Sequence, residues 1–390
     1  MSPHPIRVAF VSHHPHLQMG GQRSMALLIE HLDRSVVLPL VICPGPGPLA
    51  DHLTALGCPV AYIPLYHIKP RTLGAVWRSS RRIRELLALR AIDIIAPDAS
   101  RDALTAGLAK LGTRTKLVWF VRQTAPYSLD PLLGRLADGM IGDSDDTKRR
   151  FSGSVARRHR TIVGGADLGR FHPADDRPAL RRTLELPADR LVVLFAGQVK
   201  EAKGVLDIVD ALGRLQAGTP DRLPLLVIVG TPDPPGIVAD IARRTEAQGT
   251  TEHVRVLPQQ AEVERWMQAA DIVVSGSHED TEGMSRVLYE AMACGAVPIA
   301  TDIRGNRDAI TSETGMLVPE RDPSAIAAAI RALDTDPVRR ATFRAAGIAR
   351  ARERFDIRRH ARAVEAFFQE VLRGALAPPS GADETSDHDA

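Results

Sequence analysis

The chain of 390 residues is poor in cysteine, lysine and aromatic residues, and it has no long apolar run. Its three cysteines show no Cys-x-x-Cys spacing, which argues against a zinc site or a disulfide framework and favours a reducing compartment. No stretch approaches the roughly 18 apolar residues of a membrane span, and the first residues lack the apolar core of a secretory signal. The sequence therefore predicts a cytoplasmic protein, with possible peripheral contact at the inner face of a membrane.

A strong excess of charge of one sign is also missing. The formal net charge is +3 and the isoelectric point is about 8.9, so no nucleic-acid partner is expected. The 44% apolar and 25% charged residues are typical of a globular protein. The length exceeds what one hydrophobic core comfortably fills, so we expect two domains.

Short apolar runs alternate with amphipathic helical patterns along most of the chain. The runs 6–12 and 36–43 are typical of buried strands, and the segments 22–32 and 75–90 are typical of helices. Continuous apolar strands in βαβ order indicate a parallel sheet with helices on both faces. The expected fold class is therefore α/β, with two successive doubly wound domains and a ligand cleft where their strand ends face one another.

A segment rich in glycine, proline and charge, 161–189, interrupts this alternation. We expect a first domain over residues 1–168 and a second over 172–357. A last helix over 358–374 is expected to pack back onto the first domain. The polar, acidic tail 375–390 is expected to be disordered.

Two of only six lysines, Lys200 and Lys203, lie between an apolar strand candidate, 190–197, and a helix that follows Gly204. Backbone N–H groups at a helix start and nearby ammonium groups together attract anions. The loop is therefore either a phosphate site or an ordinary solvated loop. Gly230 ends the next apolar run and suits backbone contact with a flat ring.

The stretch EDTEGMSRVLYEAMACG, residues 279–295, places Glu282 and Glu290 eight residues apart around a predicted loop-to-helix junction. The two glutamates are a catalytic acid/base pair, a ligand clamp, or solvated residues of a surface helix. Eight helical residues rise about 12 Å, whereas the two carboxyl groups of a glycosidase lie about 5–10 Å apart. This comparison favours the clamp, because a carboxylate accepts two hydrogen bonds from a sugar diol.

The longer stretch 279–310 resembles the signature of the large retaining glycosyltransferase family 4, the glycosyl transferases group 1, which use nucleotide sugars and have the GT-B fold. The resemblance also takes in SETGMLVPERDPSAIAAAI, ARERFD, AGQVKEAKG, VGGADLGRFHP and GGQRSMALLIEHL, so it covers nearly the whole chain. It implies two Rossmann-like domains facing a central cleft. The first would bind the acceptor, and the second would bind the nucleotide sugar.

The resemblance also implies roles for single residues. Glu290 would hold the ribose hydroxyls, and Glu282 would contact the hydroxyls of the donor sugar. Lys203 would neutralise the donor phosphates as the nucleoside diphosphate departs. With Arg122 of the first domain, Glu282 and Lys203 form the expected catalytic set. The other expected donor contacts are Gly20, Gly21, Gly197, Gln198, Gly230, Gly283, Met284 and Ser285.

Two positions depart from the family pattern. Gln198 stands where the family usually has an arginine, and Phe120 stands where we align a histidine that lies near the donor sugar. Arg122 and Gln123 remain as polar candidates at that strand end. These departures favour, as an alternative, a catalytically impaired nucleotide-sugar-binding member or partner subunit, and a sugar phosphorylase on the same fold is a third possibility.

The histidine-rich stretch SHHPHL, 12–17, lacks acidic partners at ligand spacing, so we expect it to touch the acceptor and not a metal. The family implies no metal and no cofactor beyond the donor substrate. The expected activity is a retaining transfer to a hydroxyl of a glycan, lipid-linked or small-molecule acceptor, as in cell-envelope polysaccharide biosynthesis. The basic stretch 77–90 is either a solvated helix face or a contact with anionic lipid.

Overall fold

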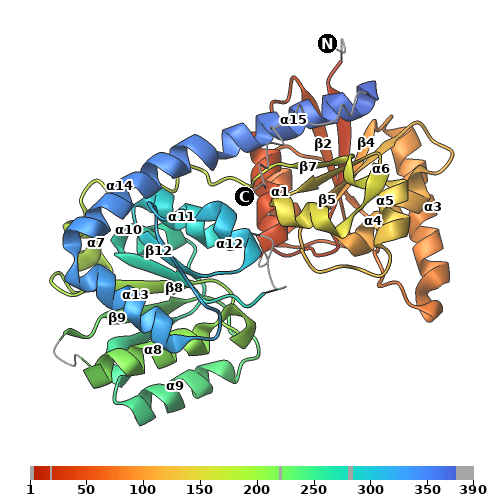
Figure 1. Ribbon diagram of the computed structural model, residues 1–390. Coiled ribbons are helices and arrows are strands. Elements are labelled where there is room, and N and C mark those ends of the chain that lie inside the picture. The colour runs from red at the N-terminus through yellow and green to blue at the C-terminus, as the bar shows by residue number, and fades with distance from the viewer. Residues whose placement is uncertain (1–3, 18–19, 219–221, 280–283, 375–390) are drawn as a thin grey trace, which may run out of the picture.

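The computed structural model describes residues 4–17, 20–218, 222–279 and 284–374, which form two α/β domains lying side by side (Figure 1). The expected disordered tail, 375–390, lies outside the described residues. Each domain is a parallel sheet with helices on both faces, which confirms the expected fold class.

The first sheet has seven parallel strands in the order β3-β2-β1-β4-β5-β6-β7. β4 is the central strand, and β1 beside it pairs with β2 on one side and β4 on the other, so that Val8 lies between Pro39 and Ile94. The strands are β1 (Ile6–Val11), β2 (Val37–Cys43), β3 (Val60–Tyr62), β4 (Ile94–Pro97), β5 (Lys116–Val121), β6 (Gly139–Gly142) and β7 (His159–Thr161).

Helices cover both faces of this sheet. α1 and the last helix of the chain, α15, share one apolar core with the sheet, and α3 and α4 share the other. The helices of the first domain are α1 (Gly20–His31), α2 (Pro48–Ala55), α3 (Leu73–Leu89), α4 (Ser100–Lys110), α5 (Asp130–Leu136) and α6 (Gly153–Ala156), with short 3-10 helices η1 (Pro70–Thr72) and η2 (Asp145–Arg150).

The second sheet has six parallel strands in the order β10-β9-β8-β11-β12-β13, and β8 and β11 lie at its centre. Its strands are β8 (Val192–Ala196), β9 (Leu225–Val229), β10 (Val254–Leu257), β11 (Ile272–Ser275), β12 (Val297–Thr301) and β13 (Met316–Val318).

Its helices also form two layers, with α8 and α13 in one core and α10 and α11 in the other. Asp322 and Asp336 begin α13 and α14 in the same way, because each carboxylate accepts backbone N–H bonds and a proline follows it. The helices are α7 (Arg177–Thr183), α8 (Val205–Gly218), α9 (Ile237–Gln248), α10 (Val263–Ala269), α11 (Arg286–Cys294), α12 (Arg304–Ala309), α13 (Pro323–Thr335) and α14 (Pro337–Arg354), with 3-10 helices η3 (Glu201–Lys203) and η5 (Thr251–His253).

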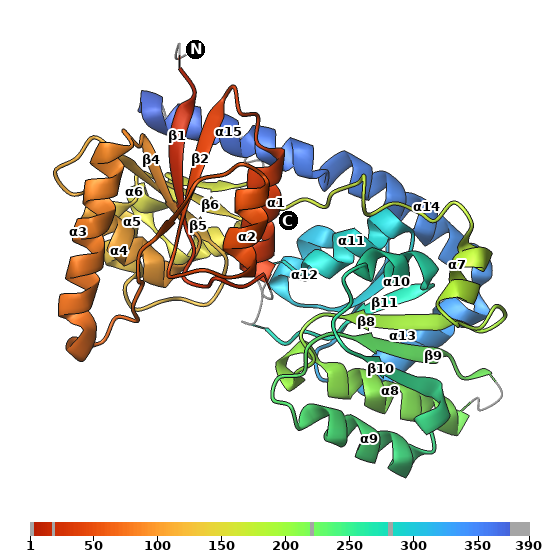
Figure 2. The same ribbon diagram turned by 180° about the vertical axis from the view of Figure 1, so that it is seen from behind.

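Two stretches of chain pass between the domains side by side. α14 ends on the second domain and α15 (Ile357–Arg373) lies on the first, as both views of the molecule show (Figures 1 and 2). The linker residue Ala166 donates its N–H to Phe355 O at 2.7 Å and accepts from Ile357 N at 3.0 Å. A Cβ on Gly165 would lie 2.5 Å from the Cα of Ile357, so this crossing needs a glycine.

Both sheets reverse their strand order at one point, between β1 and β4 in the first domain and between β8 and β11 in the second. In open α/β sheets, ligands bind beyond the carboxyl ends of the strands at such a point. The residues that follow these four strands therefore define where a functional site is expected.

Candidate functional site

Glycines bring three loops of the second domain into backbone contact. Gly204 has φ +67°, and a Cβ there would lie 2.0 Å from the carbonyl oxygen of Gly276. A Cβ on Gly230 would lie 1.6 Å from the carbonyl oxygen of Gly197. The loops after β8, β9 and β11 therefore pack without side chains between them, as close approach to a ligand requires.

The lysine loop lies beside the loop that leads to the glutamate-rich stretch. Lys203 is half-buried in η3, directly before α8, and His278 donates its backbone N–H to Ala202 O at 3.0 Å. Gln198, where the family usually has an arginine, donates from Nε2 to Asp233 Oδ2 at 2.8 Å. Gln198 thus joins the loops after β8 and β9.

At the start of α11, Ser285 is the residue before the helix, and Met284 is buried in the second-domain core. The side chain of Met284 therefore packs against apolar neighbours, which leaves only its backbone for the expected ligand contact. Glu282 and Gly283, both expected in the site, lie outside the described residues.

Glu290 lies in the second turn of α11 and pairs with Arg286 of the first turn. Its Oε1 accepts from Arg286 Nη2 at 2.7 Å and Nε at 3.2 Å, and its side chain is 11% exposed. Burial acts to lower the pKa of Arg286, but the Glu290 carboxylate and Tyr289 together raise that pKa above its ordinary value.

Arg286 also connects the two domains, because its Nη1 donates to Ser24 Oγ of α1 at 3.1 Å. Burial and the charge of Arg286 lower the pKa of Arg23, the residue before Ser24. We call the region formed by α1 residues 20–24 and the start of α11 the domain junction. Figure 2 shows α11 and α12 on the side of the second domain that faces α1.

Gly20 and Gly21 are the first two residues of α1, at the domain junction. A Cβ on Gly21 would lie 3.0 Å from Oδ2 of Asp98, the residue that follows β4. Asp98 is 5% exposed, and burial raises its pKa against the opposing effect of Arg122. The expected catalytic residue Arg122 donates from Nε to Asp98 Oδ1 at 2.9 Å. Its guanidinium is therefore engaged by a buried carboxylate.

Phe120 does not lie at the strand end. It is 2% exposed inside β5, its ring centroid lies 6.4 Å from that of Phe10, and both belong to the core under α1 and α15. Position 120 is therefore a core position, and the polar residue at the end of β5 is Arg122, 5.1 Å above the Phe120 ring. Gln123 is exposed, and its carbonyl oxygen accepts from Arg150 at 2.8 Å.

The histidine loop after β1 does have an acidic partner, contrary to the expectation from the sequence. His13 Nδ1 lies 2.8 Å from Oδ2 of Asp102 in α4, 89 residues further along the chain. The separation along the chain hid this contact, and nothing in the local spacing pointed to it. Over the described ranges, no three His, Cys, Asp or Glu residues cluster as a metal site would require.

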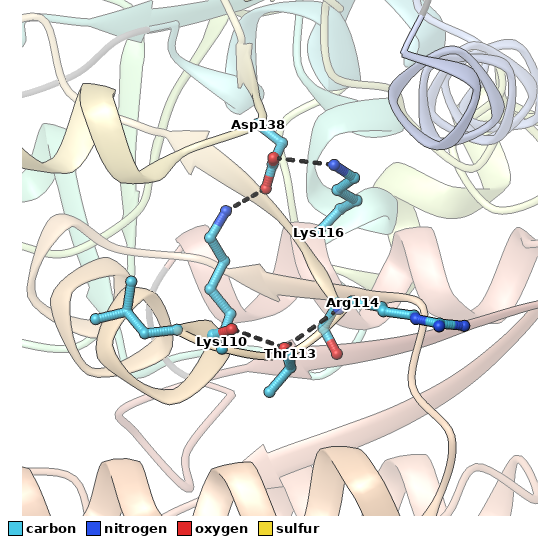
Figure 3. Close-up of a pocket in the computed structure, with 8 residues that line it drawn as sticks. Lys110, Thr113, Arg114, Lys116 and Asp138 are labelled. Atoms are coloured by element: carbon cyan, nitrogen blue, oxygen red, sulfur yellow. Dashed lines mark hydrogen bonds and ion pairs between the residues drawn. The ribbon is translucent and has the colours of Figure 1, made fainter.

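A hollow of about 450 Å³ lies elsewhere, at the amino end of β5 (Figure 3). Asp138 there is bonded by Lys110, by Lys116 at 3.5 Å and by the backbone N–H of Leu117 at 2.8 Å. Both lysines of the hollow pair with Asp138, and the hollow lies at the opposite edge of the sheet from the carboxyl ends of the strands. The hollow is therefore not the expected ligand site.

Known proteins resemble the second domain most clearly. Residues 190–336 match the family model described as Glycosyl transferases group 1. A D-inositol 3-phosphate glycosyltransferase of Jonesia denitrificans is 34% identical over 192 residues, which cover 47% of this chain and 45% of that protein. One from Xylanimonas cellulosilytica is 34% identical over 221 residues, 55% of this chain and 51% of that protein. The chain thus matches about half the length of these curated relatives.

Solved structures resemble nearly the whole chain. Anabaena HepE in complex with UDP has a TM-score of 0.82 at 19% identity, covering 94% of this chain and 100% of that one. Sucrose-phosphate synthase from Thermosynechococcus elongatus has a TM-score of 0.76 at 21% identity, covering 94% and 99%. The fold is therefore the GT-B fold of glycosyltransferases. The resemblance to the glycosyl transferases group 1 that the stretch 279–310 indicated is confirmed by the match over residues 190–336.

Proposed function

We propose that this protein transfers a sugar from a nucleoside-diphosphate sugar to an acceptor hydroxyl. The second domain holds the nucleotide sugar, and the first domain holds the acceptor. The observation that carries the proposal is the domain junction, where Glu290 and Arg286 of a group 1 glycosyltransferase domain meet α1 of the other domain. The Glu290 carboxylate there suits the ribose diol of a nucleotide sugar. The Arg286 guanidinium and the start of α11 suit its phosphates.

In the donor complex, Glu290 accepts hydrogen bonds from the ribose hydroxyls in place of its present bonds from Arg286. Lys203 and the freed Arg286 neutralise the diphosphate. Backbone groups of Gly197, Gly230 and Ser285 contact the base and the phosphates, and Glu282 with the amide of Gly283 contacts the sugar. The transfer keeps the anomeric configuration and uses no metal, since cationic side chains take over the role of a metal ion.

The donor base is proposed to be uracil, because Anabaena HepE, which shares this fold, was solved with UDP and with UDP-glucose. The acceptor is proposed to be a polyol, glycan or lipid-linked saccharide. The names of the curated relatives, which specify inositol 3-phosphate, support a polyol.

We further propose that the protein works in the cytoplasm, with its first domain in peripheral contact with a membrane, in cell-envelope polysaccharide synthesis. α3 supports this contact, because Leu73 and Trp77, one helical turn apart, are 55% and 61% exposed beside the exposed Arg78 and Arg81. None of the described helices is long and apolar enough to cross a membrane.

The experiment that tests the function incubates the purified chain with UDP-glucose and other nucleoside-diphosphate sugars, with polyol phosphates or lipid-linked saccharides as acceptors. We expect glycosylated product and release of nucleoside diphosphate, undiminished by a chelator, with the anomeric configuration of the donor. Binding of a nucleotide sugar without turnover would favour the impaired-member alternative. Turnover that requires inorganic phosphate would favour the phosphorylase.

A further inference from the structure

A small hollow in the second domain is lined by three arginines. It has a volume of about 180 Å³ and lies where α7, α14 and the amino ends of β11 and β12 meet. The helices α7 and α14 lie side by side there in both views (Figures 1 and 2). Its charged lining residues are Arg177, Asp271, Arg340 and Arg344, and we call it the arginine hollow. The donor is expected at the other edge of this sheet, so the arginine hollow is separate from the donor site.

The carboxylate of the arginine hollow is already committed to other donors. Asp271 Oδ1 accepts from Arg177 Nη2 at 2.6 Å, and its Oδ2 accepts from Arg181 Nη2 at 2.6 Å. The backbone N–H of Val192 donates to the same Oδ2 at 2.8 Å. These bonds hold α7 against the amino ends of β8 and β11. Acceptors are short even here, since the buried Nε of Arg177 has no partner in the described part of the chain.

Arg344 is left without a carboxylate of its own. Its half-buried guanidinium makes no hydrogen bond or ion pair with any residue of the described ranges. Burial and the charge of Arg177 lower the pKa of Arg344, against the opposing effect of Asp271. The guanidinium lies at the carboxyl end of α11, where a Cβ on Gly295 would be 3.1 Å from its Nε. A helix end supplies only a partial negative charge, so the charge of Arg344 is not fully compensated.

The charges around the arginine hollow leave room for a dianion. Arg340, near the start of α14, donates to Leu333 O, which carries no charge. The nearby carboxylate of Asp336 caps α14 and adds one negative charge. Two carboxylates, Asp271 and Asp336, thus stand against four guanidinium groups, those of Arg177, Arg181, Arg340 and Arg344. A phosphate monoester carries about −1.5 to −2 charges at neutral pH, and a guanidinium can donate two parallel hydrogen bonds to its oxygens.

We propose that the arginine hollow binds the phosphate group of a small soluble anion, either inorganic phosphate or a phosphate monoester. Arg344 and Arg340 are the binding residues, and Arg177, held by Asp271, adds its charge from α7. Pockets for larger organic ligands measure about 300–1,000 Å³, so the arginine hollow suits a phosphate group with a small organic part. The site does not depend on the proposed function, because none of its residues belongs to the expected donor or acceptor contacts.

The test measures the affinity of inorganic phosphate and of sn-glycerol 3-phosphate for the full chain by calorimetry, with potassium chloride keeping the ionic strength constant. The variants are Arg344→Gln and Arg340→Gln, with Arg352→Gln, an exposed arginine of the same helix, as the matched control. Lys203→Ala removes a charge expected at the donor phosphates, and therefore separates the arginine hollow from the donor site. Melting temperatures are measured for every variant with and without phosphate.

We expect Arg344→Gln to weaken the binding of both ligands by about 10-fold or more, because it removes a charged donor. Arg340→Gln should weaken binding in the same direction, whereas Arg352→Gln and Lys203→Ala should stay within about twofold of the wild type. Without phosphate, Arg344→Gln should melt at or above the wild-type temperature, because the guanidinium that it removes has no partner. Phosphate should raise the melting temperature of the wild type and not that of Arg344→Gln.

Unchanged phosphate affinity in Arg344→Gln, or a wild type that binds phosphate with a Kd above about 10 mM, would overturn the inference. Loss of phosphate binding in Lys203→Ala would assign the phosphate to the donor site and overturn it as well. If Arg344→Gln melts well below the wild type without phosphate, Arg344 holds α14 in place and is not a ligand residue. A chain that binds no nucleotide sugar would overturn the proposed function and leave the arginine hollow intact.

Discussion

Glu290 accepts both hydrogen bonds from Arg286 on one oxygen, Oε1, while Arg286 itself makes the contact with α1. Binding of a nucleotide at this carboxylate requires an exchange of hydrogen-bond partners. A ribose diol would take the place of the guanidinium, which could then turn to the phosphates. The same carboxylate thus both restrains Arg286 and is expected to hold the ligand.

We expect Glu290→Ala to weaken nucleoside-diphosphate binding, because a hydrogen bond to a charged group contributes about 1.5–3 kcal/mol, on the order of 10–100-fold in Kd. Calorimetry with UDP measures the change, and the exposed Glu313→Ala is the control. The variant also leaves Arg286 without its carboxylate, so the double variant with Arg286→Ala should recover melting temperature but not affinity. Unchanged affinity would remove Glu290 from the ribose site.

Lys203→Ala should lower the rate of transfer and the affinity for the diphosphate together, since one charge serves both the bound and the departing phosphates. Lys116→Ala is the matched control, because this lysine lies at the amino end of β5 and pairs with Asp138. Normal steady-state kinetics in Lys203→Ala would exclude it from the site.

Single residues show where the sequence was informative and where it was not. The stretch 279–295 could be recognised from the sequence, because Glu282 and Glu290 lie only eight residues apart, at one predicted loop-to-helix junction. Phe120 was misleading, because β5 is buried on both faces as far as Val121, and the polar residue at the strand end is Arg122, two positions further on. The contact of His13 with Asp102 depends on the pairing of β1 with β4, which no local pattern encodes.

Among the elements, α15 has the clearest structural role. Phe367 and Phe368 are buried in the core of the first domain, and Glu365 accepts the N–H of Asp33 at 2.7 Å. The last helix of the chain therefore completes the first domain, although α14 before it belongs to the second. A change in α15 should act on the first domain.

Phe368→Ala should reduce the unfolding free energy of the first domain by about 3–5 kcal/mol, because a large buried ring leaves a cavity. The control is Leu372→Ala on the same helix, which is 37% exposed and should cost less than about 1 kcal/mol. Chemical denaturation followed by the fluorescence of Trp119, buried in the same domain, measures both. Equal losses in the two variants would contradict the packing of α15.

His360 makes the attachment of α15 sensitive to acid. It is buried, and its Nδ1 donates to Val163 O of the linker at 2.8 Å. Burial lowers its pKa to about 4. Between pH 6.5 and 4 the unfolded chain binds a proton that the folded chain does not. The unfolding free energy therefore decreases as the pH is lowered through this window, by about 3 kcal/mol in total.

His360→Asn keeps a donor for Val163 and cannot titrate, so its unfolding free energy should fall less steeply between pH 6.5 and 4 than that of the wild type. Above pH 6.5 the two pH profiles should run parallel. His159, whose pKa burial also lowers to about 4, remains in both proteins and contributes equally. Identical slopes below pH 6.5 would show that His360 is not held neutral.

Element prediction succeeded where an apolar run or a helical period was long. The expected strand 36–43 is β2 at 37–43, and the expected helix 75–90 is α3 at 73–89. The edge strands β3 and β7 have three residues each, too few for a periodic pattern, and neither was expected. α7 lies inside the segment that composition marked as a linker, because Asp176 caps its first turn and a proline is also well suited to a helix start.

At the scale of the whole molecule, two domains built on parallel sheets meet at the domain junction, where α11 contacts α1. The covalent connections are the linker around Ala166 and the turn from α14 to α15, which are bonded to one another. Arg286 and Ser24 add a contact across the junction itself. A nucleotide that displaces Arg286 from Glu290 would therefore also change the contact between the domains.

The most direct test of the central claim is thermal unfolding of the full chain with a panel of nucleoside-diphosphate sugars and nucleoside diphosphates. A ligand at about 100 times its Kd stabilises the folded state by about 2.7 kcal/mol, so we expect at least one donor to raise the melting temperature by several degrees. The shift should shrink in Glu290→Ala and persist in Glu313→Ala. A panel in which no nucleotide moves the wild-type melting temperature would contradict the account.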